Sequence, residues 1–135
     1  MPPIPSPETR TAISSKLATL IQTIESDPSF DRTSPSAGAG LFHMWDFAKR
    51  TEYMLSEVEN IRQPGYEFRL PGQIKITARG DAAAQQLFND TLTRSITLDQ
   101  LISGPPMMRA MMGLAGPVSP EIQAASKAVV DAFGQ

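Results

Sequence analysis

Cysteine is absent from the 135 residues, and histidine occurs once. The lack of cysteine excludes a disulfide framework, a thiol nucleophile and every thiolate metal site. One histidine with scattered carboxylates leaves no convincing ligand set for zinc. Neither a nucleophile–base constellation nor a glycine-rich phosphate loop is recognisable. The sequence therefore predicts a protein that is not an enzyme and that holds no metal or other cofactor.

A strong net charge is also lacking, because 12 basic side chains face 14 acidic ones, for a formal charge of −2. Proteins that coat nucleic acid usually carry a clear basic excess. No apolar run approaches the roughly 20 residues that span a bilayer. The opening Met-Pro-Pro-Ile-Pro lacks the basic and apolar regions of a secretory signal. We expect a soluble protein without membrane insertion, located in the cytoplasm or inside a particle or complex.

Proline, by contrast, is abundant, with 12 in the chain. The prolines lie between segments of periodic hydrophobicity rather than inside them, which is typical of a protein of short helices. Three of them fall in residues 1–6, where they favour an extended arm. The remainder, residues 7–135, fits one domain of ordinary size. The predicted organisation is a proline-rich N-terminal arm followed by a single mostly helical domain.

Two helices are marked by the same opening, Ser-Pro-Glu, at Ser6 and at Ser119. Serine suits the N-cap, proline the first helical position, and glutamate the positive end of the helix dipole. The first helix is expected to end before Pro28. Apolar residues at helical spacing follow each opening, namely Ile13, Leu17, Leu20, Ile21 and Ile24 in the first helix and Ile122, Ala125, Val129 and Phe133 in the last.

Between them, a second helix is predicted over roughly 41–62 and a third after Asp81, which we expect to act as its cap. Thr97-Leu98-Asp99-Gln100 has the spacing of a capping box, so a new short helix is expected to begin there and to end at Gly104. Another short helix is predicted at Met107–Leu114. The predicted fold class is mainly α, with about five helices, two of them short.

Residues 66–78 change to a repeat of two, since Tyr66, Phe68 and Leu70 alternate with charged residues. That repeat is typical of half-buried strands. Pro71-Gly72 favours a turn between them, although its type II twist suits a tight hairpin poorly. A β-hairpin and an extended insertion packed on the helices both remain possible.

Four aromatic residues crowd the second predicted helix, too many for one narrow stripe. They are either the densest part of the core or anchors of an interface. Four methionines form one flexible face around residues 107–112, which suits either a core filler or a docking surface. The candidate interface residues are therefore Phe42, Trp45, Phe47, Tyr53, Met107, Met108, Met111 and Met112.

Cations gather in the extended region, at Arg62, Arg69, Lys75 and Arg79. They are candidates for contact with an anion, such as a phosphate backbone or an acidic neighbour. The alternative is a solvated edge whose charges discourage strand pairing.

Three functional hypotheses follow. The first is a non-catalytic structural or accessory subunit of a larger assembly, such as a virion or phage-particle component or a small subunit of a multiprotein complex. It would act through protein–protein contacts, as a homo- or hetero-oligomer. The second is a small-ligand protein or enzyme with an apolar pocket around His43 and Asp46, lined by Trp45, Tyr53, Tyr66 and methionines. The third is nucleic-acid contact through the cations at 62–79.

Overall fold

The structure, a computed structural model, describes residues 4–28, 30, 39–63, 79–104, 107 and 118–134. These ranges hold four α-helices, and none of their residues lies in a β-strand. The helices are α1 (Pro7–Glu25), α2 (Ala39–Ser56), α3 (Asp81–Ser103) and α5 (Pro120–Phe133), and a short 3-10 helix, η1 (Asn60–Arg62), follows α2. The prediction of a mainly helical protein is confirmed.

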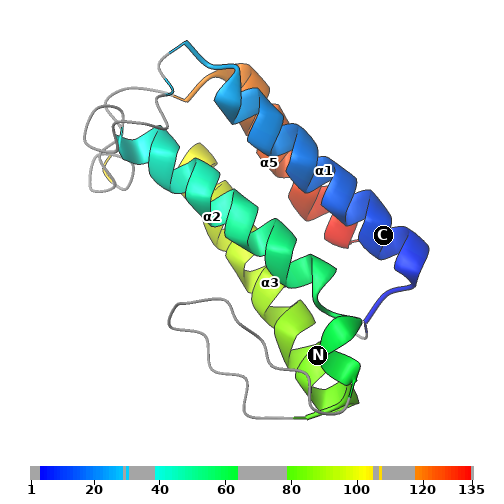
Figure 1. The fold of residues 1–135 in the computed structure, drawn as a ribbon. Helices are drawn as coiled ribbons and strands as arrows, with labels where there is room; N and C mark the ends of the chain where they lie inside the picture. Colours follow the sequence, from blue (N-terminus) through cyan, green and yellow to red (C-terminus); the bar gives the residue numbers. More distant parts are fainter. Residues whose placement is uncertain are drawn as a thin grey trace.

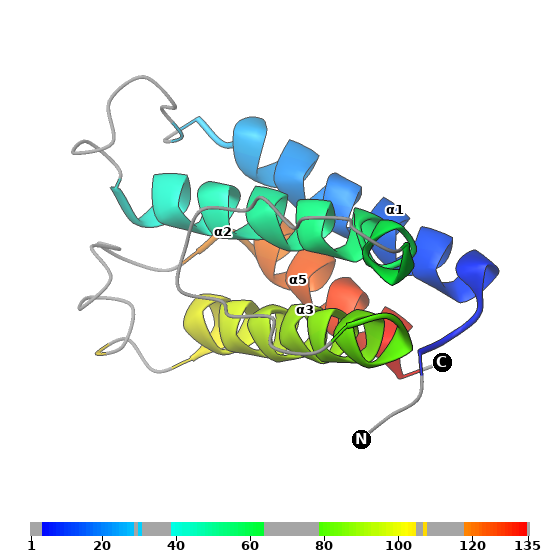
Figure 2. The same cartoon turned by 60° about the horizontal axis from the view of Figure 1, so that its bottom comes forward.

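The four α-helices form an antiparallel bundle in which each runs opposite to the one before it (Figure 1). α1 packs against α2 and α5, and α3 packs against the same two helices. Figure 2 shows the resulting ring, with the end of α2, the start of α3, the start of α1 and the end of α5 at one end of the bundle. The starts of α2 and α5 therefore share the opposite end with the last turns of α1 and α3.

Both predicted serine caps are confirmed. The Ser6 hydroxyl accepts a hydrogen bond from the backbone N–H of Thr9, and the Ser119 hydroxyl accepts one from Ile122, each at 3.3 Å. These bonds satisfy one of the donors that a helix start leaves without a partner inside the helix. Proline occupies the first turn in both helices.

The predicted apolar stripes form the core. Ile13, Leu17 and Leu20 of α1 are fully buried, as is Ile122 of α5. The largest fully buried side chains come from all four helices and from the turn after α2, and they are Ile13, Leu17, Leu20, Ile24, Met54, Leu87, Leu98, Ile102, Ile122, Val58 and Val129. The division into an arm and one domain stays a prediction, although Ile4, within the predicted arm, packs against this core.

α3 corrects one prediction, because it runs without a break through the expected helix start at Thr97. The Thr97 hydroxyl donates to the carbonyl oxygen of Thr93 at 2.9 Å, so it bonds back into the helix instead of capping a new one. Leu98 and Ile102 continue the buried stripe of the preceding turns. Burial of this stripe outweighs the local capping signal.

Two helix boundaries also differ. α2 ends at Ser56 rather than near residue 62, and the Glu57 N–H bonds to the carbonyls of both Tyr53 and Met54 as the chain turns towards η1. The cap of α3 is Gly80, whose φ of 63° is a conformation that favours glycine. Asp81 is the first helical residue and not the cap.

The described ranges therefore hold four α-helices rather than about five. The insertion predicted at 66–78 lies outside the described residues. So does the short helix predicted at Met107–Leu114, apart from Met107 itself. Within the described part of the chain, no helix combines the length and the apolar character needed to cross a membrane.

Candidate functional site

A pocket of about 300 Å³ lies between α2 and α3. Its volume is at the lower end of the range for small-molecule sites. α2 contributes residues 43, 44, 46, 47 and 50, and α3 contributes 94, 98 and 101, so each helix offers one face at helical spacing. The lining residues are His43, Met44, Asp46, Phe47, Arg50, Arg94, Leu98 and Leu101.

The lining is apolar in its deeper part and charged elsewhere. Met44 and Leu98 are 3% and 2% exposed, and Phe47 and Leu101 are half-buried against the core. Asp46 and Arg50 form an ion pair at 3.0 Å and are each about two-fifths exposed. An apolar floor with a few polar groups is the usual composition of a ligand pocket.

Arg94 is the most unusual lining residue. Its Nε donates to the Thr51 hydroxyl at 3.0 Å, and its Nη2 donates to the carbonyl oxygen of Phe47 at 3.3 Å. Its guanidinium carbon lies 3.9 Å from the centre of the Phe47 ring. Thr51 is fully buried, and its hydroxyl donates in turn to the Phe47 carbonyl at 2.7 Å. α2 therefore fixes the guanidinium through two hydrogen bonds and a cation–π contact.

All these contacts are with neutral groups. None of the carboxylates in the described part of the chain lies within ion-pair distance of the Arg94 guanidinium. Burial lowers the pKa of Arg94, the nearby Arg50 charge lowers it further, and Asp46 and Asp90 partly oppose this. Burial likewise raises the pKa of Asp90, one turn before Arg94 on α3. The cation is held in place but is poorly compensated in charge.

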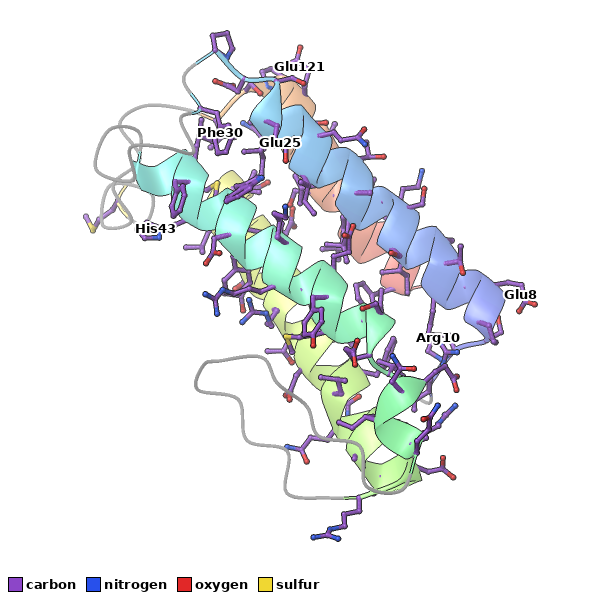
Figure 3. The ribbon with its side chains drawn as sticks, in the orientation of Figure 1. Glu8, Arg10, Glu25, Phe30, His43 and Glu121 are labelled. Carbon is purple, nitrogen blue, oxygen red and sulfur yellow. The ribbon has the colours of Figure 1, made fainter. Side chains whose placement is uncertain are left out.

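His43, which also lines the pocket, is exposed and lies near the start of α2 (Figure 3). Its ring meets the Phe42 ring edge-on, with 6.0 Å between their centres. No hydrogen bond joins His43 to Asp46, whose carboxylate pairs with Arg50. His43 and Asp46 both line the α2–α3 pocket, but the two residues do not form an acid–base pair. The ligand pocket predicted around them stays a prediction.

The aromatic residues of α2 divide between two sides of the helix. The Trp45 indole N–H donates to Glu25 of α1 at 2.9 Å, on the side away from the pocket. The rings of Phe30 and Phe42 each lie 5.6 Å from the Trp45 ring, and the Lys49 ammonium lies 4.8 Å from it. Phe47 is at the pocket, and Tyr53 is 37% exposed. Neither Trp45 nor Tyr53 lines the α2–α3 pocket, so their predicted role in a pocket lining stays a prediction.

The other predicted site residues are only partly described. Met107 is 77% exposed, while Met108, Met111, Met112 and Tyr66 lie outside the described residues. Arg69 and Lys75 also lie outside them. Arg79 is exposed. Arg62 is ion-paired, through Nη1 to Glu59 at 2.8 Å and through Nε to Asp81 at 3.1 Å.

A second arginine, Arg10 of α1, is 8% exposed and was not anticipated. It donates to the Glu59 carboxylate, which it shares with Arg62. The hydrogen bond from Arg10 is the largest cause of a lowered pKa at Glu59, which is itself half-exposed. This network ties the start of α1 to η1 and, through Asp81, to the start of α3 (Figure 3).

Sequence reasoning missed both Arg10 and Arg94, although a signal was present. Arg10 lies three residues before Ile13 and Arg94 four before Leu98, so each charge occupies a position aligned with a buried apolar side chain. A charged group at such a position must be hydrogen-bonded, be paired with an opposite charge or reach solvent, because burying it alone is costly. Looking for charged residues on apolar stripes would have found both.

The described residues hold no group of three or more histidine, aspartate or glutamate side chains placed to bind a metal ion. The α2–α3 pocket, with Arg94 fixed beside apolar side chains, is therefore the candidate site. Comparison of the chain with known protein families, curated proteins and solved structures found no significant match.

Proposed function

We propose that this is a non-catalytic binding protein that takes a small ligand into the α2–α3 pocket. The pocket itself carries the proposal, because it places apolar side chains and a fixed cation around about 300 Å³ of space. A small, half-apolar cavity with few polar groups suits selective binding of one class of molecule.

The groups around the pocket favour binding over catalysis. Asp46 is engaged with Arg50, and among the described residues His43 has no hydrogen-bond partner that would orient its ring as a base. The two arginines attract anions but do not transfer protons at neutral pH.

Thermal unfolding with a matched panel of ligands tests the proposal. We would use 4-phenylbutyrate, 4-phenylbutanol and 4-phenylbutylamine, which share a body and differ in charge. A ligand at 100 times its Kd stabilises the folded state by about 2.7 kcal/mol. At least one member should raise the midpoint of unfolding with a saturating dose response.

Leu101→Trp, which fills the pocket, should abolish that rise. Ile96→Trp is the matched control, because Ile96 is on the same helix, is 39% exposed and does not line the pocket. If no member of the panel stabilises the protein, or if Leu101→Trp responds like wild type, the pocket is not a ligand site.

A second candidate, a subunit of a larger assembly, is supported by the exposed apolar side chains. Met107 is 77% exposed and Tyr53 is 37% exposed, and such residues anchor protein interfaces. Native mass spectrometry at micromolar concentration tests self-association. Met107→Lys and Tyr53→Lys should each shift any oligomer towards monomer, whereas Gln100→Lys, at an exposed polar position of α3, should not. A wild-type chain that stays monomeric and captures no partner would remove this candidate.

A further inference from the structure

Arg94 is a lining residue whose guanidinium is held in a fixed position by α2. Its guanidinium has five N–H donors, and the hydrogen bonds to Thr51 and Phe47 use two of them. The planar group is therefore fixed in orientation and still has donors for a further acceptor. A fixed guanidinium presents parallel N–H groups that match the two oxygens of a carboxylate.

The charge around Arg94 favours an anion over a neutral or cationic ligand. Arg50 adds a second positive charge to the lining, and only Asp46 among the lining residues is negative. The half-buried Arg94 lacks a carboxylate partner among the described residues, so a ligand anion would provide the missing compensation.

The same charges limit how negative the ligand should be. A doubly charged group such as phosphate would bring its second charge close to the Asp46 carboxylate, whereas a single charge is balanced by Arg94 alone. Apart from the exposed His43, the rest of the lining is apolar and consists of Met44, Phe47, Leu98 and Leu101. It suits an aliphatic or aromatic body rather than a sugar or a second charge.

We propose that the α2–α3 pocket binds a small organic monocarboxylate, with its carboxylate on the Arg94 guanidinium and its apolar body against Phe47, Leu98 and Leu101. This assignment rests on the proposed function, that the pocket holds a ligand, and adds the chemical class. Arg94 is the anchoring residue, and the Asp46–Arg50 pair sets the limit of one negative charge.

Isothermal titration calorimetry of the full chain tests the assignment. The probes are 4-phenylbutyrate, the neutral 4-phenylbutanol and the doubly charged 4-phenylbutyl phosphate. A hydrogen bond to a charged group contributes about 1.5–3 kcal/mol, which is roughly a tenfold to hundredfold change in affinity. The carboxylate should bind at least tenfold more tightly than the alcohol and also more tightly than the phosphate.

Arg94→Met keeps an unbranched side chain but removes the charge and the donors. It should weaken binding of 4-phenylbutyrate at least tenfold and leave the alcohol within about twofold. Arg79→Met is the matched control, because Arg79 is an exposed arginine that does not line the pocket, and it should change neither affinity. Circular dichroism and thermal unfolding establish that each variant is folded.

Leu101→Trp keeps every Arg94 contact and fills the space, so it tests the site even if Arg94→Met fails to fold. It should abolish binding of acid and alcohol alike. Retention of full acid affinity in this variant would overturn the assignment.

The two proposals fail in different ways. If acid and alcohol bind equally and Arg94→Met affects neither, the pocket is a ligand site but the carboxylate assignment is wrong. If the phosphate binds most tightly, the limit of one charge is wrong. If no probe binds, both the proposed ligand binding in the pocket and the carboxylate assignment are wrong.

Discussion

Two arginines, Arg10 on α1 and Arg94 on α3, occupy equivalent kinds of position but are held in opposite ways. Each lies in line with buried apolar residues of a long helix. Arg10 is 8% exposed and meets the carboxylate of Glu59, which Arg62 also contacts. Arg94 is half-buried and is held by a hydroxyl, a carbonyl and an aromatic ring.

The difference distinguishes a charge that is matched within the fold from one that, in our proposal, binds a ligand. An arginine whose charge is matched by a carboxylate already has its strongest partner within the fold. An arginine held by neutral groups is positioned but keeps an unmatched charge. We therefore propose that Arg10 contributes to stability and that Arg94 contributes to ligand binding.

The largest effect is expected at Glu59. Glu59→Gln leaves the buried Arg10 without its carboxylate, and we expect the free energy of unfolding to fall by about 2 kcal/mol at pH 7, less than for a fully buried pair because Glu59 is half-exposed. Chemical denaturation measures this loss. Asp46→Asn, which breaks an exposed ion pair, is the control and should lower the free energy of unfolding by less than about 0.5 kcal/mol. Equal losses would contradict the role of Arg10.

The same pair predicts a pH dependence. The pKa of Glu59 is lowered from 4.5, chiefly by the hydrogen bond from Arg10. Its contribution to stability is therefore present above pH 4.5 and is lost as the pH falls through the lowered folded-state pKa. Denaturation curves between pH 7 and pH 2 should show wild type and Glu59→Gln converging as the pH decreases. A constant difference would show that the carboxylate charge is not responsible.

Arg94→Met should lower the free energy of unfolding by about 1 kcal/mol at most, which is less than the loss expected for Glu59→Gln. Methionine can cover the Phe47 ring, and the Phe47 carbonyl keeps its hydrogen bond from Thr51. The measurement is chemical denaturation in the absence of ligand. If Arg94→Met lowered the free energy of unfolding as much as Glu59→Gln, Arg94 would be a residue that mainly stabilises the fold. That result would contradict the distinction between the two arginines.

The smallest effect concerns binding at the pocket rim. Asp46→Asn removes the one acidic residue of the pocket lining and, with it, the ion pair to Arg50. We expect 4-phenylbutyrate to bind about twofold more tightly, which corresponds to the modest energy of an exposed ion pair. Calorimetry checks this, with 4-phenylbutanol as the uncharged control. Weaker acid binding would mean that Asp46 holds Arg50 in a favourable position instead of competing with the ligand.

The sequence predicted the elements whose signals are local. The Ser-Pro-Glu openings and the apolar stripes identified α1 and α5, because caps and helical spacing act within a few residues. The break expected at Thr97 was wrong because the buried positions of Leu98 and Ile102 depend on packing with other helices. A capping motif alone cannot report such packing.

The site was predictable only in part. His43 and Asp46, both named from the sequence, line the α2–α3 pocket, but Arg94 and the two leucines come from another helix. Sequence spacing does not show which helix faces will meet. The division of the aromatics between the Trp45 side and the Phe47 side also depends on that packing. The position of its charge in line with buried apolar residues is the one local signal that could have identified Arg94 from the sequence.

Mapping of backbone amide chemical shifts by NMR during titration with 4-phenylbutyrate tests the central claim most directly. We expect saturable shifts in α2 around residues 43–50 and in α3 around 94–101, and little change around Arg10 and Glu59. No saturable shifts, or shifts centred away from the α2–α3 pocket, would contradict the assignment of Arg94 to ligand binding.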